Sequence, residues 1–302
     1  MPFGVLNVFL KFKGGTKMVG IIDIGSNTIR LVMYENGKKL ENISVTSEIL
    51  HDTEDGQLTY IGTQKLCDAI AYLKNEAKGY PVHALATFAF RVLSNKEEVK
   101  KEVFEKTGIL IDVLSGEDEA KCDFCALINE IGKDKTGIGV DLGGGSAQIF
   151  AFEKENMLFF DSYPIGAKKI KKLFVERVYP TKEEAEKIES YIENYVEKVE
   201  FKSETVYMMG GTAKTALRIY NFIKGTQNVE YIDVNELKEL TEFLKSTTGV
   251  IIKDVLKSKY DNMACGLMVI EKIASHLGAK KIVVLVGGVR EGYLLMNEIE
   301  KM

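Results

Sequence analysis

The sequence is poor in the residues that build metal centres and disulfide frameworks. Its 302 residues include three histidines and four cysteines. Cys122 and Cys125 form a lone C-x-x-C pair, with no second pair and no histidine nearby. A zinc site needs about four ligands, so this pair does not make a zinc motif. We expect the cysteines to be reduced thiols in a cytoplasmic protein.

Long apolar runs, flexible linkers and an excess of basic charge are also missing. No apolar stretch in the sequence is long enough to span a bilayer. Only four prolines occur, and no Ser/Gly-rich segment divides the chain, so a hinge is expected between domains. The net charge of −4 gives no global field for nucleic acid or an anionic membrane, and neither is expected as a partner. An anionic substrate must therefore be bound by local groups.

What the chain does contain is an internal repeat. The segment "IIDIGSNTIRLVMYENGK" starts at Ile21, and "GVDLGGGSAQIFAFEKEN" starts at Gly139. When Asp23 is aligned on Asp141, the acid, the following aliphatic residue, the glycine, a hydroxyl and the next apolar strand all match. The offset of 118 residues predicts two related halves.

The order of the expected elements predicts an α/β fold in two domains. Apolar strands alternate with charged helices throughout, and the length suits two cores. We expect an N-terminal extension at 1–17, a first domain at 18–122 and a second at 123–289. A C-terminal helix at 290–302 is expected to pack back on the first domain.

Four expected strand ends carry glycine turns. They read Asp23-Ile-Gly-Ser-Asn, Asp141-Leu-Gly-Gly-Gly-Ser, Gly210-Gly-Thr and Gly287-Gly. Backbone N–H groups in such turns, and at helix N-termini, bind phosphate oxygens. The predicted phosphate-binding residues in these turns are Ser26, Asn27, Gly143, Gly144, Gly145, Ser146, Gly210, Gly211, Thr212, Gly287 and Gly288.

Two of these turns follow an aspartate. A carboxylate that faces phosphates is repelled unless a cation lies between them, and Mg²⁺ binds one or two carboxylates together with phosphate oxygens. Asp23 and Asp141, facing each other across a cleft, would hold Mg²⁺ or Mn²⁺. The alternative is that both aspartates only cap their turns.

The motifs together resemble one family. In order they are "DIGSNTIRLVMYE", "TFAFR", "SGEDEA", "DLGGGSAQ", "YPIGAKKI", "GGTAKTALRI" and "GGVREGYLL". This series is similar to the exopolyphosphatase / guanosine pentaphosphate phosphohydrolase family, from about residue 18 to the end. The resemblance implies two duplicated ribonuclease H-like domains with a cleft between them, as in actin, sugar kinases and heat-shock chaperones.

The resemblance also implies a set of catalytic residues. Glu119, in the position of the family's general base, would activate the attacking water. Arg91 follows the family's phosphate-contacting arginine, whose guanidinium suits bidentate phosphate binding. Lys169 falls where the family places a basic residue near the phosphates. Glu119 could instead serve the dipole of its helix, and the lysines beside Lys169 could be a solvated helix face.

Two departures from the family pattern bear on activity. Gln148 stands where the family has a glutamate, and an amide cannot take a proton or hold Mg²⁺ as firmly. The family's "ERAD"-like motif reads "SKYD" here, with Lys259 in place of the arginine and Tyr260 in place of the alanine. This departure makes the substrate harder to predict. The chain is also expected to be the short, two-domain form, because it lacks the His-Asp pair of the longer members' extra domain.

The sequence therefore predicts a Mg²⁺-dependent phosphohydrolase that uses Glu119, Asp141, Arg91 and Gln148. Its substrate would be inorganic polyphosphate or guanosine pentaphosphate, and a homodimer is possible. Two alternatives stay open. The first alternative is a nucleotide or polyphosphate sensor with little or no turnover, which Gln148 would suit. The second alternative is an ATP-dependent kinase of the same superfamily.

Overall fold

The computed structural model describes residues 18–26, 28–46, 49, 51–226, 229–246 and 261–299. Four features expected from the sequence lie outside these ranges. They are the N-terminal extension at 1–17, the phosphate-binding Asn27, and the altered motif residues Lys259 and Tyr260.

The described chain separates into two compact units. The second unit is Ala120–Gly292, and the first unit comprises the described residues up to Glu119 together with those from Tyr293 onward. The divisions fall inside helix α4, Gly116–Ile131, and helix α11, Val289–Ile299. The expected domain boundary at residues 122 and 123 lies within the same helix α4.

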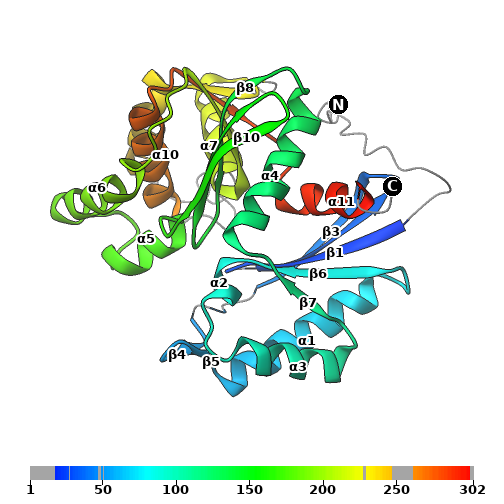
Figure 1. Ribbon diagram of the computed structural model, residues 1–302. Coiled ribbons are helices and arrows are strands. Elements are labelled where there is room, and N and C mark those ends of the chain that lie inside the picture. The colour runs from blue at the N-terminus through cyan, green and yellow to red at the C-terminus, as the bar shows by residue number, and fades with distance from the viewer. Residues whose placement is uncertain are drawn as a thin grey trace. The chain divides into compact units, whose positions relative to one another are not determined.

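The first unit is built on a five-stranded sheet in the order β3-β2-β1-β6-β7 (Figure 1). Its strands are β1 Met18–Ile24, β2 Thr28–Glu35, β3 Lys38–Thr46, β6 Val82–Ala86 and β7 Ile111–Val113. The first three pair antiparallel, whereas β6 and β7 continue the sheet in parallel. A small ribbon is formed by β4, Thr53–Glu54, and β5, Gln57–Leu58.

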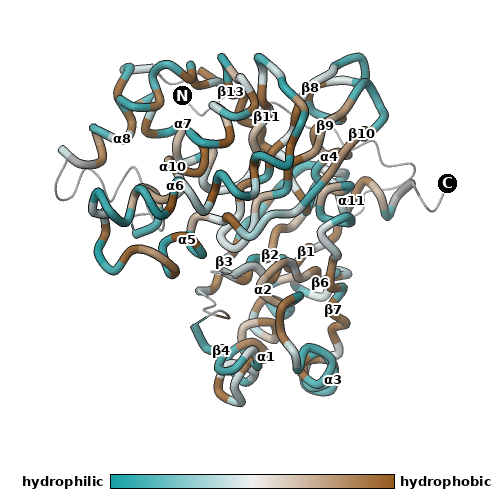
Figure 2. Tube along the Cα trace, turned by 60° about the vertical axis from the view of Figure 1, so that its left-hand side comes forward, coloured by the Kyte–Doolittle hydropathy of each residue, from teal (hydrophilic) through white to brown (hydrophobic). Residues whose placement is uncertain are grey.

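Helices α1, Tyr60–Glu76, and α3, Lys96–Thr107, pack against each other in the first unit (Figure 1). The Thr59 side chain caps the start of α1 by accepting from the N–H of Gly62. Helix α3 ends at Gly108, which adopts the left-handed conformation of a C-terminal cap. The buried residues of α3 are Val99, Val103 and Thr107, whereas the trace beside the α3 label in Figure 2 is hydrophilic. One apolar face therefore completes the core while the charged face stays in solvent.

From the sequence, Arg91 is expected at the start of the helix that ends at Gly108, and this prediction is wrong. Arg91 ends a separate four-residue helix, α2, Phe88–Arg91, and α3 starts only at Lys96. The linking loop is tied to the β4–β5 ribbon, because the Asn95 side chain bonds both backbone groups of Leu58. These bonds turn the chain between the two helices.

The second unit contains a six-stranded sheet in the order β10-β9-β8-β11-β13-β12. Its strands are β8 Thr136–Leu142, β9 Ala147–Glu153, β10 Asn156–Tyr163, β11 Thr205–Met209, β12 Tyr231–Asp233 and β13 Lys281–Val284. The helices of this unit include α5 Ala167–Phe174, α6 Lys182–Val196, α7 Gly210–Lys224, α8 Leu237–Ser246 and α10 Met263–Leu277. A continuous apolar core joins the sheet to α6, α7 and α10.

The backbone pairing confirms the internal repeat. Asp23 lies opposite Arg30 in the β1–β2 pair, and Asp141 lies opposite Gln148 in the β8–β9 pair. Both turns close with the same hydrogen bond. Gly25 N–H donates to Thr28 O at 3.1 Å, and Gly143 N–H donates to Ser146 O at 3.0 Å. The predicted duplicated α/β fold is therefore confirmed.

Within the described ranges, no helix combines the length and the apolar character needed to cross a membrane.

Candidate active site

The glycine turn of residues 143–146 forms a backbone site at the end of β8. It is closed by the bond from Gly143 N–H to Ser146 O. Among the described residues, the N–H groups of Gly144, Gly145 and Ser146 donate to no acceptor. Successive N–H groups of this kind form a concavity that binds anions. The geometry thus suits the phosphate contacts predicted for this turn.

Gln148 is held in one orientation beside this turn. Its Nε2 donates to Ser146 Oγ and to Ser162 Oγ, both at 2.9 Å, and the residue is only 2% exposed. The amide lies directly across the strand pair from Asp141. Ser162, on β10, is a partner that the sequence motifs did not single out.

Helix α7 begins against the Asp141 carboxylate. Gly210, its first residue, has φ of +89°, and a Cβ there would overlap Oδ1 of Asp141 and lie 2.6 Å from the carbonyl oxygen of Leu142. Only glycine allows this approach. The positive end of the α7 dipole therefore lies next to the acid. Within the described part of the chain, the buried Thr212 hydroxyl has no hydrogen-bond partner.

Lys214 interacts electrostatically with Asp141 and with Glu130, and the sequence motifs identified neither Lys214 nor Glu130. Lys214 Nζ donates to Val286 O at 2.6 Å. Burial lowers the pKa of Lys214; Arg290 adds to this effect, whereas Glu291, Asp141 and Glu130 oppose it. Lys214 could have been found from the sequence, because it follows Gly210 by four residues. Nothing in the local sequence pattern indicated Glu130.

The turn at Gly287 and Gly288 has a protein partner of its own. The Glu130 carboxylate accepts from the N–H groups of Val286 and Gly287, each at 2.9 Å. One predicted phosphate donor is therefore bonded to a carboxylate in this structure. Phosphate binding by Gly287 and Gly288 stays a prediction.

Lys169 lies at the start of α5, beside the glycine turn. Its N–H donates to Gly144 O at 2.9 Å, and the N–H of Ala167 donates to Gly143 O at 3.2 Å. The sequence placed this lysine near the phosphates, and the structure places its backbone against the predicted phosphate turn.

In the first unit, the equivalent acid and turn have a charged neighbour. Asp23 ends β1 opposite Arg30, where the second unit has Gln148. Ser26, in the turn, is 8% exposed. Opposite charges across a strand pair are favourable, so Arg30 is a suitable neighbour for a carboxylate at Asp23.

Arg91 and Glu119 meet within the first unit. Arg91 Nη1 donates to a Glu119 carboxylate oxygen and, at 2.8 Å, to the carbonyl oxygen of Leu114. Glu119 is 4% exposed. Its helix is capped by other residues, since the Ser115 hydroxyl and Asp118 bond reciprocally at the start of α4. The side-chain cap of α4 is therefore formed by Ser115 together with Asp118.

The donor chemistry around Asp141 suits a hard divalent cation. A carboxylate, a serine hydroxyl and an amide converge at one strand pair, and oxygen donors are what Mg²⁺ prefers. Among the described residues, no group of three or more His, Cys, Asp or Glu forms a metal cluster. Mg²⁺ commonly keeps several waters, so Asp141 would be its anchor in this unit. The participation of Asp23 in binding the same Mg²⁺ stays a prediction.

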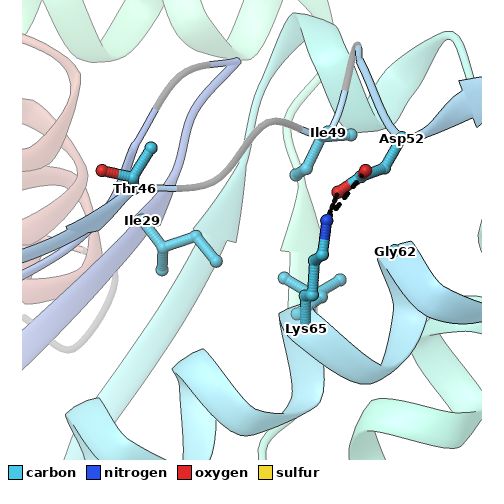
Figure 3. Close-up of a pocket in the computed structure, with 7 residues that line it drawn as sticks. Ile29, Thr46, Ile49, Asp52, Gly62 and Lys65 are labelled. Atoms are coloured by element: carbon cyan, nitrogen blue, oxygen red, sulfur yellow. Dashed lines mark hydrogen bonds and ion pairs between the residues drawn. The ribbon is translucent and has the colours of Figure 1, made fainter.

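A small pocket of about 180 Å³ lies at the start of β2 in the first unit (Figure 3). Its apolar wall includes Ile29 and Ile49, and Thr46 lines it as well. Lys65 Nζ bonds both carboxylate oxygens of Asp52 at 3.0 Å (Figure 3). This ion pair links Asp52, just before β4, to α1.

Comparison with known proteins identifies the family. The model of the Ppx/GppA phosphatase family matches residues 37–300. The chain is 28% identical over 305 residues to a bifunctional 3-dehydroquinate synthase/phosphatase of Fusobacterium nucleatum, covering 90% of this chain but only 46% of that protein. It is 24% identical over 302 residues to exopolyphosphatase 1 of Mycobacterium tuberculosis, covering 92% of this chain and 87% of that one.

Solved structures show the same fold. An exopolyphosphatase from Cytophaga hutchinsonii superposes with a TM-score of 0.82 at 18% identity, covering 94% of this chain and 98% of that chain. A Ppx/GppA family member from Aquifex aeolicus gives a TM-score of 0.78 at 21% identity, covering 95% and 99%. With its family model matched over residues 37–300, the chain belongs to the Ppx/GppA phosphatase family.

Proposed function

We propose that the protein is a phosphohydrolase that releases the terminal phosphate of inorganic polyphosphate or guanosine pentaphosphate. The observation that carries this proposal is the turn at Gly144–Ser146, whose N–H groups have no acceptor among the described residues, beside the Asp141 carboxylate. Relatives named exopolyphosphatase support the substrate class. Phosphoryl transfer needs positioning and charge neutralisation more than covalent chemistry, and the turn and its neighbours supply both.

In the proposed reaction, water attacks the terminal phosphorus and the anhydride P–O bond breaks. Glu119 takes the proton from the water, and the products are phosphate and a chain shortened by one phosphoryl group. Arg91 binds phosphate oxygens, and the 143–146 turn holds the phosphoryl group. Asp141, with Asp23, would hold Mg²⁺ or Mn²⁺, which when bound neutralises phosphate charge. Gln148 would orient the attacking water, because a side-chain amide cannot take its proton.

A phosphate-release assay with tripolyphosphate, long-chain polyphosphate and guanosine pentaphosphate tests the proposal in the presence of Mg²⁺. Release from at least one of them is expected. The second candidate function is a sensor, favoured by the buried amide at Gln148 in place of a carboxylate. Tight binding with no phosphate release would support the sensor. Transfer of labelled phosphate to an acceptor other than water would instead support a kinase.

We also propose a cytoplasmic location and a homodimer. The four cysteines are free thiols, and a reducing compartment keeps thiols in this state. Light scattering on the purified protein measures the oligomeric state, and a mass of about one chain would contradict the dimer.

A further inference from the structure

A row of three side chains crosses the second sheet beside the glycine turn. Asp141 on β8 lies opposite Gln148 on β9, and Gln148 lies opposite Ser162 on the edge strand β10. Residues that lie directly opposite in antiparallel pairs share one face of the sheet. The three side chains are therefore neighbours on one face, and Ser162 is the outermost member of the row.

The internal repeat contains the same row in the first unit. Asp23 lies opposite Arg30, and Arg30 lies opposite Ser44. Each position of the second row follows its counterpart by 118 residues. The acid and the serine are thus present in both rows, and only the central residue differs. This makes Ser44 the direct comparison for Ser162.

Gln148 donates both of its amide hydrogens to serine hydroxyls. Its Nε2 donates to Ser146 Oγ and to Ser162 Oγ, each at 2.9 Å. A side-chain NH2 group has two hydrogens, so these two bonds use both of them. Each serine oxygen is therefore an acceptor here, and each keeps its own O–H hydrogen for another partner.

The hydroxyl of Ser146 is left as a donor in the predicted phosphate turn. Ser146 is 4% exposed, and among the described residues its Oγ donates to no acceptor. Buried polar groups ordinarily have hydrogen-bond partners. Ionised phosphoryl oxygens accept hydrogen bonds and do not donate them, so they suit this hydroxyl. The direction of the bond from Gln148 thus prepares Ser146 to donate to a phosphoryl group.

A carboxylate at position 148 would reverse these bonds. An ionised glutamate only accepts hydrogen bonds, so it would take the hydroxyl hydrogens of Ser146 and Ser162. The Ser146 hydroxyl would then donate to the protein and not to a phosphoryl group. The amide of Gln148 therefore gives Ser146 a donor role that a carboxylate at the same position would remove.

We propose that Ser162 is a positioning residue, which holds the Gln148 amide so that Ser146 donates to the phosphoryl group that is transferred. The inference rests on the proposed function. Without the Ser162 hydroxyl, one amide hydrogen loses its acceptor, and the amide can rotate to present Oε1 to Ser146. The Ser146 hydroxyl then donates to Oε1, and its bond to the phosphoryl group is lost. Ser162 itself touches no substrate and acts through Gln148.

The test is a double-mutant cycle of Ser162→Ala and Ser146→Ala, measured by phosphate release from tripolyphosphate. Ser162→Ala is expected to lower kcat/KM roughly two- to tenfold, the effect of losing one hydrogen bond between neutral groups. Ser146→Ala removes the donor to a charged oxygen and should lower it roughly tenfold to a hundredfold. In the Ser146→Ala protein, adding Ser162→Ala should cause no further loss. A purely structural Ser162 would instead cause the same loss in both backgrounds.

Two further variants control for the loss of the side chain itself. Ser162→Thr keeps the hydroxyl and should restore kcat/KM toward the wild-type value. Ser44→Ala is the matched control from the first unit. Ser44 is exposed, and within the described ranges its hydroxyl makes no hydrogen bond, so kcat/KM should stay as in wild type.

Wild-type kcat/KM in Ser162→Ala, or equal losses from this change in both backgrounds, would overturn the proposal. If wild type releases no phosphate from tripolyphosphate, long-chain polyphosphate or guanosine pentaphosphate, the proposed function fails separately. The Kd of tripolyphosphate, measured by calorimetry on wild type, the two single variants and the double variant, then completes the same cycle. Additive changes in this Kd would also contradict the role of Ser162.

Discussion

Arg91 and Glu119, 28 residues apart, form an ion pair within the first unit. Nη1 makes the hydrogen bonds of the guanidinium, to Glu119 and to the carbonyl oxygen of Leu114. Among the described residues, Nε and Nη2 have no acceptor, so this edge can bind phosphate oxygens. One arginine thus orients the proposed base and keeps donors for the substrate.

Glu119→Gln is expected to lower kcat by about two to four orders of magnitude, the usual effect of losing general acid–base catalysis. KM should change little, because a base acting on water contributes mainly in the transition state. Steady-state phosphate release measures both constants. The matched control is Glu117→Gln in the exposed first turn of the same helix. Wild-type turnover in Glu119→Gln would show that another group is the base.

Arg91→Ala is expected to raise KM for short chains about tenfold to a hundredfold, since a charge-assisted hydrogen bond is worth roughly 1.5–3 kcal/mol. The same change removes the partner of buried Glu119, so the free energy of unfolding should also fall. Arg91→Lys keeps the charge but loses the planar fork, and an intermediate KM is expected. If only stability changes and KM does not, Arg91 is structural.

Asp141→Ala is expected to abolish turnover, and excess EDTA should do the same to wild type. The carboxylate lies beside the predicted phosphate turn and the start of α7, so its loss removes the proposed metal anchor. Asp134→Asn, in the exposed segment before β8, is the control. Full phosphate release in EDTA would contradict the metal requirement.

Gln148→Glu is expected to tighten Mg²⁺ binding while lowering stability without metal. The new carboxylate would lie directly opposite Asp141, and like charges across a strand pair are destabilising. Thermal unfolding in EDTA and in Mg²⁺ should show a lower Tm in EDTA and a larger rise with Mg²⁺ than in wild type. Gln148→Met, which removes the amide without adding charge, should show no such gain. An equal Mg²⁺ response in all three proteins would sink the prediction.

Lys214 should make stability depend on alkaline pH. Its pKa is lowered in the folded protein, chiefly by burial, so the unfolded chain binds more protons between that pKa and about 10.4. The free energy of unfolding of wild type relative to Lys214→Met should therefore rise with pH across this window. Lys224, whose pKa Glu236 and Glu239 raise by hydrogen bonding, gives the opposite sign: wild type should lose its advantage over Lys224→Met as the pH rises above about 10.4. Parallel pH profiles for Lys214→Met and wild type would contradict the assignment.

The sequence alone determined the features that depend on neighbouring residues. An apolar strand, a turn of small residues and a second apolar strand form a hairpin locally, so the position of Asp141 before residues 143–146 could be predicted. The 118-residue repeat followed from the same patterns, and the pairing of Asp23 and Asp141 with their opposite residues confirmed it.

Only the tertiary structure decided which distant side chains meet. Lys214 bonds Val286, 72 residues away, and Glu130 bonds the turn at Gly287, 157 residues away. Periodicity reports which face of an element is buried, but not which strand or helix lies against that face. The same limit applied to Arg91: the local pattern does not show that a separate helix ends at Arg91, or that Asn95 bonds the ribbon residue Leu58 before the next helix starts. The hydrogen-bond partners of these side chains therefore depend on how the helices and strands pack together, and the local sequence pattern does not encode this packing.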